Sequence, residues 1–189
     1  MTRMLAALAA LALLTGTPAA ARADVVQEWN AILLTTLAGQ NPFAQARFAA
    51  VTQLAVFEAI NAITDEYEPY LGTLSVPADA SAEAAGIAAA HAVLKHYFPA
   101  RAATLDAARA SSLAALPEGP AMAAGIAVGE AAAAALVALR ASDGAAPPQF
   151  YLPISSDPGL WQTTAGCPAA GGILFHWQNL RPFAVVRSS

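Results

Sequence analysis

The three histidines are the first candidates for chemistry, because an imidazole can bind a metal ion or move a proton near neutral pH. His91 and His96 are five residues apart in a predicted helix, so their side chains diverge by about 140° around its axis. A helical metal site needs histidines four residues apart, as in the H-E-x-x-H motif. The spacing indicates that His91 packs or caps inside the fold and that His96 lies near a helix end. His176 lies between two aromatic residues and is interpreted as structural, although a histidine in the C-terminal region could approach a site.

Glu58 and Asn61 form a second candidate pair, because residues three apart on a helix lie on one face. A carboxylate on a mostly buried helix can act as a general base. Alternatively, both side chains form hydrogen bonds that lock the following loop, which carries Tyr67 and Tyr70. We favour this structural interpretation, and the general base remains the alternative.

Cys167 is the only cysteine, and no histidine stands close to it in the sequence to activate its thiol. A single cysteine also excludes a disulfide bond within the chain. The sequence contains no G-x-S-x-G, P-loop, C-x-x-C or dinucleotide-binding motif. We therefore assign no catalytic, cofactor-binding or metal-binding residue from these patterns.

Residues 1–23 have the pattern of a secretory signal peptide. A positively charged start precedes an apolar run over 5–14, which is too short to span a bilayer as a helix. The run is followed by Ala21-Arg22-Ala23, which matches an A-x-A cleavage site. We expect cleavage after Ala23 and a periplasmic or secreted protein. An uncleaved membrane anchor would need a longer apolar run.

The mature chain is acidic. Cleavage would remove two of the nine basic residues and leave seven against thirteen acidic ones, a formal charge of −6. Nucleic acids and anionic lipids bind to basic surfaces, so we expect neither as a partner. The basic residues are spread along the sequence from Arg47 to Arg187, which predicts no cluster of cations that could hold an oxyanion.

The composition predicts an all-α fold. Hydrophobic residues make up 57% of the chain and are largely alanine, whereas charged residues make up 12%. This composition favours closely packed helices, and no segment shows the period-two alternation of a strand. We expect a five-helix bundle over residues 24–144. The approximate ranges of its helices are 25–37, 42–64, 79 or 81 to 98, 99–116 and 121–141.

The helix at about 42–64 is predicted to be the centre of this bundle. Asn41 is suited to cap it, and Pro42 is suited to its first position. Apart from a polar stripe, its circumference is apolar, so we expect other helices on several of its sides. Phe57 should then be fully buried.

The helix at about 121–141 contains Gly125 and Gly129 on one face, and small residues at this spacing let another helix approach closely. This helix is also apolar enough to resemble a membrane span. Its apolar residues are mainly alanine, however, and Glu130 lies in its middle. We therefore expect no membrane span after signal cleavage.

Residues 145–189 differ in composition from the bundle. They include six prolines, which exclude long helices, and more large aromatic residues than a disordered linker would carry. We expect an extended tail that wraps the bundle and belongs to the same domain.

Several stretches, taken in order, resemble the N-terminal helical half of bacterial vanadium-dependent haloperoxidase-like proteins, which belong to the type 2 phosphatidic acid phosphatase superfamily. Their residues are 29–30, 48–63, 67–70, 90–94, 98–99, 125–130, 139–144, 158–164 and 182–183. The resemblance covers nearly all of residues 24–183. For a complete relative it implies peroxide-dependent halide oxidation on vanadate, or hydrolysis of phosphate monoesters at the same site.

The resemblance does not extend to the family's oxyanion site, which uses a lysine seven residues before Arg-Pro, a Ser-Gly-His, and a later arginine and histidine. Here the only Arg-Pro is Arg181-Pro182, and Leu174 stands seven residues before the arginine. The chain has no Ser-Gly-His, and its only lysine is Lys95. The resemblance thus implies that the catalytic half would follow Ser189 and that no vanadate ligand lies in this chain.

Three functional hypotheses follow. The chain is an exported haloperoxidase-like N-terminal half that is inactive alone, with a missing C-terminal half or a second copy of itself as its partner. Alternatively, it is a non-catalytic helical binding or dimerisation module. The third hypothesis is an enzyme with a new site around Glu58, His91 or His176.

Overall fold

The computed structural model describes residues 24–72, 74–167 and 171–185. The predicted signal peptide over 1–23 and its cleavage site lie outside the described residues, as do the last four residues of the predicted tail.

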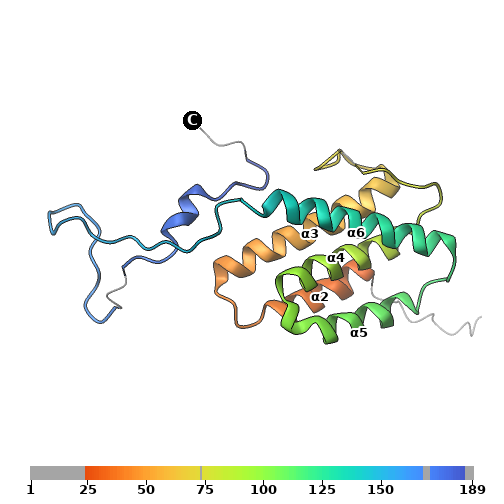
Figure 1. Cartoon of the computed structure of the whole chain (residues 1–189), viewed down its shortest axis with the longest axis horizontal. Coiled ribbons are helices and arrows are strands. Elements are labelled where there is room, and N and C mark those ends of the chain that lie inside the picture. Colours follow the sequence, from red (N-terminus) through yellow and green to blue (C-terminus); the bar gives the residue numbers. More distant parts are fainter. Residues whose placement is uncertain (1–23, 73, 168–170, 186–189) are drawn as a thin grey trace, which may run out of the picture.

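Five α-helices form the described part of the chain's bundle (Figure 1). The helices are α2 (Val25–Leu37), α3 (Pro42–Thr64), α4 (Ala82–Tyr97), α5 (Ala102–Leu113) and α6 (Pro120–Arg140). Two short 3-10 helices, η1 (Pro99–Arg101) and η2 (Phe175–Asn179), complete the elements, and the described residues contain no strand. The all-α prediction is confirmed.

Local sequence signals explain where the helices begin. The side chains of Asp24, Asn41 and Ser81 each accept a hydrogen bond from a backbone amide in the first turn of α2, α3 and α4. Each cap satisfies an amide that has no partner within its helix. Pro42 and Pro120 occupy first-turn positions, where a missing amide hydrogen costs nothing.

The helix at the centre is α4, not α3 as the sequence predicted. It packs against α2, α3, α5 and α6, and its residues 84–91 are all buried. Most of these residues are alanine or glycine, and small side chains let neighbouring helices approach closely on every side. The prediction for α3 was based on its hydrophobic residues. The structure shows that α4 is central because its side chains are small.

Helices α4 and α6 approach each other closely at two glycines of α6. A Cβ atom at Gly125 or Gly129 would overlap a backbone carbonyl oxygen of the facing helix segment, that of Ser81 or Ala85 respectively. The predicted role of these two glycines is therefore confirmed.

The surface position of α3 also changes the prediction for Phe57, which is only half-buried. Its ring borders an apolar groove of about 400 Å³ whose wall includes Val26 of α2 and Ile60 of α3. The buried face of α3 consists of other residues, among them Val51, Ala55 and Ala59.

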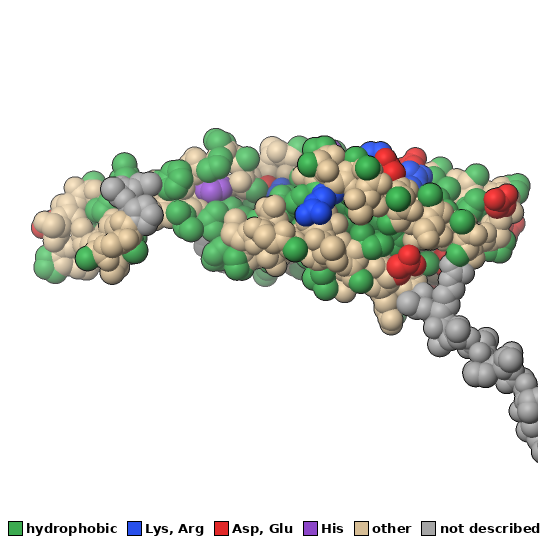
Figure 2. All heavy atoms as spheres, turned by 90° about the horizontal axis from the view of Figure 1, so that it is seen from below, with side chains coloured by type: hydrophobic (Ala, Val, Ile, Leu, Met, Phe, Trp, Pro, Cys, Tyr) green, Lys and Arg blue, Asp and Glu red, His purple; other side chains and the backbone are tan. Residues whose placement is uncertain are grey.

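The tail is extended, but most of it leads away from the bundle instead of wrapping it (Figure 1). We call residues 145–167 and 171–178 the arm. Two hydrogen bonds of 2.8 Å pair Tyr151 with Gly172, and the rings of Tyr151, Trp161 and Phe175 pack together. The arm thus packs partly on itself, and the chain returns to the bundle at about residue 177. Figure 2 shows hydrophobic side chains along this arm and most of the charged ones over the bundle.

Helices α3 and α6 are both long and apolar enough to cross a membrane by length and composition. The sequence pointed to the second of them alone. Core helices of helical bundles meet the same criterion, so it is weak support for a membrane span.

Candidate functional site

Glu58 and Asn61 of α3 hold the loop that follows the helix. The carboxylate of Glu58 is 1% exposed and accepts hydrogen bonds from the amides of Tyr70, Leu71 and Gly72 at 2.8–3.2 Å. The side chain of Asn61 accepts from the amide of Tyr67 and donates to its carbonyl oxygen. The structural interpretation of this pair is confirmed, because three protein donors already occupy the Glu58 carboxylate.

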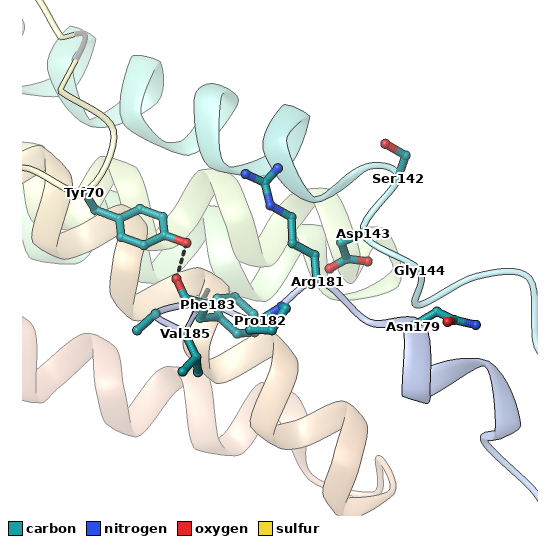
Figure 3. Close-up of a pocket in the computed structure, with 10 residues that line it drawn as sticks. Tyr70, Ser142, Asp143, Gly144, Asn179, Arg181, Pro182, Phe183 and Val185 are labelled. Atoms are coloured by element: carbon teal, nitrogen blue, oxygen red, sulfur yellow. Dashed lines mark hydrogen bonds between the residues drawn. The ribbon is translucent and has the colours of Figure 1, made fainter. Parts of the chain in front are cut away.

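The loop places Tyr70 where the end of α6 meets the returning tail (Figure 3). The hydroxyl of Tyr70 donates to the carbonyl oxygen of Phe183 at 2.6 Å and accepts from Nη2 of Arg140 at 2.9 Å. Three segments far apart in the sequence therefore meet at one hydroxyl group.

Arg140, the last residue of α6, is the largest fully buried side chain at this junction. Its guanidinium donates to the carbonyl oxygens of Arg181 at 2.8 Å and Pro182 at 3.3 Å. It also lies 3.7 Å from the ring centroid of Phe183, within range of a cation–π contact. Nε of Arg140 has no partner among the described residues.

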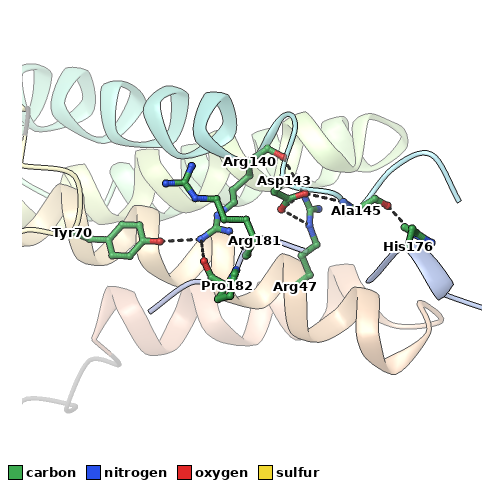
Figure 4. A network of polar contacts seen from close by, with 8 residues as sticks. All are labelled: Arg47, Tyr70, Arg140, Asp143, Ala145, His176, Arg181 and Pro182. Carbon is green, nitrogen blue, oxygen red and sulfur yellow. Dashed lines mark hydrogen bonds and ion pairs between the residues drawn. The ribbon is translucent and has the colours of Figure 1, made fainter. Parts of the chain in front are cut away.

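A buried ion pair lies beside Arg140 (Figure 4). Nη2 of Arg47 is 2.9 Å from the carboxylate of Asp143, and the side chains are 9% and 1% exposed. Arg47 also donates to the carbonyl oxygen of Arg140. The backbone of Asp143 accepts from the amide of Arg181 at 2.7 Å, so this pair joins α3, the end of α6 and the tail.

An open cavity of about 850 Å³ borders this junction, and its wall includes Tyr70, Asp143, Arg181 and Phe183 (Figure 3). The Arg181 residue is exposed, whereas Arg47 and Arg140 are buried. Both buried guanidinium groups donate to protein oxygens: Arg140 holds the tail, and Arg47 holds the segment at the end of α6.

The sequence did not predict this cluster. Arg47, Arg140 and Arg181 are spread along the chain, and their spacing gave no reason to bring them together. The signals that could have found it are the Arg140–Asp143 segment at a helix end and Arg181 before Pro182-Phe183. The first segment and Pro182-Phe183 belong to the stretches that carry the resemblance.

His91 lies at a second polar cluster, between α4 and α5. Its Nε2 donates to the carboxylate of Asp106 at 2.7 Å, and its ring is perpendicular to the ring of Trp29, with the centroids 6.2 Å apart. Nδ1 faces Nη1 of Arg109 at 3.5 Å, and Lys95 donates to the same Asp106 carboxylate. The expectation of a packed histidine is confirmed.

Burial lowers the pKa of His91 below its ordinary value of 6.5; the Asp106 hydrogen bond opposes this effect, and the charge of Arg109 adds to it. Hydrogen bonds from Lys95 and His91 lower the pKa of Asp106 below its ordinary value of 3.8. His91 is therefore neutral at neutral pH and Asp106 is ionised.

We expect the free energy of unfolding to fall as the pH is lowered from about 7 to 5, in part because of His91. A histidine with a lowered pKa binds its proton more readily in the unfolded chain, so acid favours unfolding below pH 6.5. Asp106 stays ionised in this range and adds no slope. Urea denaturation at several pH values measures the effect, and His91→Gln should give a shallower dependence than the wild type. Equal slopes in both proteins would contradict this role.

The remaining candidates are placed apart from one another. His176 is buried at the base of the arm, where its Nδ1 accepts from the amide of Gln149 and its Nε2 donates to the carbonyl oxygen of Ala145. These contacts support its structural interpretation. His96 is exposed near the end of α4, and Cys167 is exposed in the arm.

The described residues contain no group of three or more His, Cys, Asp or Glu side chains that could hold a metal ion. Comparison with protein-family models, curated proteins and solved structures gave no match to this chain.

Proposed function

We propose that this chain is the exported N-terminal helical half of a protein like the vanadium-dependent haloperoxidases and acid phosphatases, and that it is catalytically incomplete by itself. The observation that carries this proposal is the contact of Tyr70, Arg140 and Phe183. Each comes from a different stretch among those that resemble the family. Each of these stretches is weak evidence for the family by itself. Their contact at one junction is what we expect of segments that belong to the same scaffold.

The described residues do not fit a bound vanadate or phosphate. An oxyanion site needs several cationic donors that converge on one open position. Arg47 donates to Asp143 and to a carbonyl oxygen, and Arg140 donates to Tyr70 and two carbonyl oxygens. Of the described residues that line the cavity, Arg181 is the one exposed cation, and Asp143 lines the same cavity. We therefore derive no reaction step in this chain.

In this proposal the helical half supplies a scaffold, and a second polypeptide segment supplies the oxyanion site. That segment would carry the lysine, the Arg-Pro and the Ser-Gly-His that the resemblance implies for a complete relative. Cationic side chains would hold the oxyanion there, and a histidine would act as ligand or nucleophile. Glu58, His91 and His176 already make structural contacts, which favours this proposal over a new catalytic site at any of them.

The reading frames of the DNA immediately downstream of the Ser189 codon test this proposal. We expect one of them, continuous or shifted, to encode Ser-Gly-His and a lysine seven residues before Arg-Pro. Co-production of its product with this chain should give vanadate-dependent halogenation or phosphate monoester hydrolysis that neither part shows alone. A matched control carries alanine in place of the histidine in Ser-Gly-His. The lack of such a frame, or an inactive purified complex, would contradict the proposal.

A further inference from the structure

The arm exposes more large apolar side chains than the rest of the described chain. Ile154 is 83% exposed and Ile173 is 72% exposed. The other exposed ones are Phe150, Leu152, Leu160, Trp161 and Phe175. From residue 145 to residue 180 the sequence has a single charged side chain, that of Asp157. Clustered apolar exposure of this kind indicates a surface that another protein covers.

The arm has little internal structure to hold these side chains in place. Among the described residues, the Tyr151–Gly172 pair and a hydrogen bond from the amide of Phe175 to the carbonyl oxygen of Gln149 join the backbones of its two sides. Hydrogen bonds from Gln149 and His176 fix its base. A two-stranded segment with so few contacts is marginally stable in water. A partner surface would supply the missing apolar contacts.

The helices of the same chain do not lie against the exposed apolar side chains of the arm. The arm leaves the bundle beside the start of α3, where the rings of Phe43 and Trp177 are in contact. It then points away from the helices (Figure 1). The apolar groove beside Phe57 lies towards the opposite end of α3, about 21 Å from Phe43 at 1.5 Å per residue.

We propose that the arm docks in this groove of a second copy of the chain. Two antiparallel copies, shifted along their long axes so that each arm lies beside the other copy's bundle, place each arm next to the other copy's groove. This gives one reciprocal contact under two-fold symmetry. The nearly uncharged arm suits this contact, because two mature chains of formal charge −6 repel one another elsewhere. This inference goes beyond the proposed function and does not depend on it.

The exposed area is sufficient for such a dimer. A half-exposed large apolar side chain leaves ~100 Å² open to solvent. The seven side chains on each of two arms therefore expose at most on the order of 1,400 Å², and the part that enters the groove adds to the groove surface that it covers.

Sedimentation of residues 24–189 from about 1 to 100 μM tests the proposal, because interfaces of this size bind in the micromolar range or tighter. We expect a reversible dimer. A spin label on Cys167, the only cysteine and part of the arm, should give a discrete distance between two labels.

Two substitutions test the two sides of the contact. Ile154→Asp changes the arm, and Tyr67→Ala removes an exposed ring from the groove while leaving the backbone hydrogen bonds to Asn61. Each should weaken dimerisation about tenfold or more. Leu34→Asp, at an exposed position of α2 outside the groove, is the matched control and should have no effect.

Thermal unfolding verifies that each variant is folded, and Ile173→Asp replaces Ile154→Asp if the latter fails to fold. A monomer over the whole concentration range would overturn the proposal. So would dimerisation that is unchanged by the arm variant or by Tyr67→Ala. A monomer that binds a separate catalytic polypeptide through the arm would also overturn it, and would assign the arm to that partner.

Discussion

Replacing Asp143 with alanine is expected to lower the free energy of unfolding by about 3–5 kcal/mol, because it leaves a buried charge without its partner. Asp143 and Arg47 are both buried, and their charged groups are 2.9 Å apart. The substitution also removes the acceptor for the amide of Ala145 at the start of the arm. Urea denaturation of residues 24–189 measures the effect.

Two further variants make this prediction specific. Glu118→Ala changes an exposed acid and should stay within about 0.5 kcal/mol of the wild type. The double variant Arg47→Met with Asp143→Leu should be more stable than Asp143→Ala alone, because it removes both charges and fills their space. A cost for Asp143→Ala no greater than that for Glu118→Ala would show that the ion pair does not hold the junction.

Gly129→Ala is expected to lower the free energy of unfolding by about 3 kcal/mol, because it forces two packed helices apart. The added methyl group would overlap the backbone carbonyl of Ala85 and approach the Cβ of Ala88 to 2.9 Å. Backbone atoms in the middle of α4 cannot move without displacing the packed helix, so small local shifts cannot relieve the strain.

Gly86→Ala is the matched control, because it adds the same methyl group to another helical glycine. Its nearest neighbour would be the end of the Ile60 side chain at 3.1 Å, which can rotate away. Both substitutions gain about 1 kcal/mol of helix propensity, so their difference reports the close approach of α4 and α6. Thermal unfolding of the two variants gives this difference. Similar melting temperatures would contradict the described helix contact.

The starts of the helices could be predicted from the sequence because they depend on neighbouring residues. Asn41 caps α3 with its own side chain, and Pro42 follows in the position that suits it. The choice of central helix could not be predicted in this way. It depends on which helix lets the others approach closely. The small residues of α4 allow this on several sides, whereas the larger apolar side chains of α3 do not.

The same distinction applies to the candidate site. Glu58 and Asn61 hold a loop within fourteen residues of them, and the sequence pattern was sufficient to predict this contact. Arg47 and Asp143 are 96 residues apart and meet only because α3 and α6 pack side by side. The direction of the arm was likewise not predictable, because aromatic residues favour burial without specifying the surface that buries them.

The central claim is that this chain alone lacks an oxyanion site. Isothermal titration of residues 24–189 with orthovanadate, together with a bromide and peroxide halogenation assay, tests it most directly. We predict no tight binding and no turnover above a heat-killed control, and any weak binding should disappear in Arg181→Ala. Micromolar binding accompanied by turnover would contradict the account and would make His91 and His176 the first residues to replace.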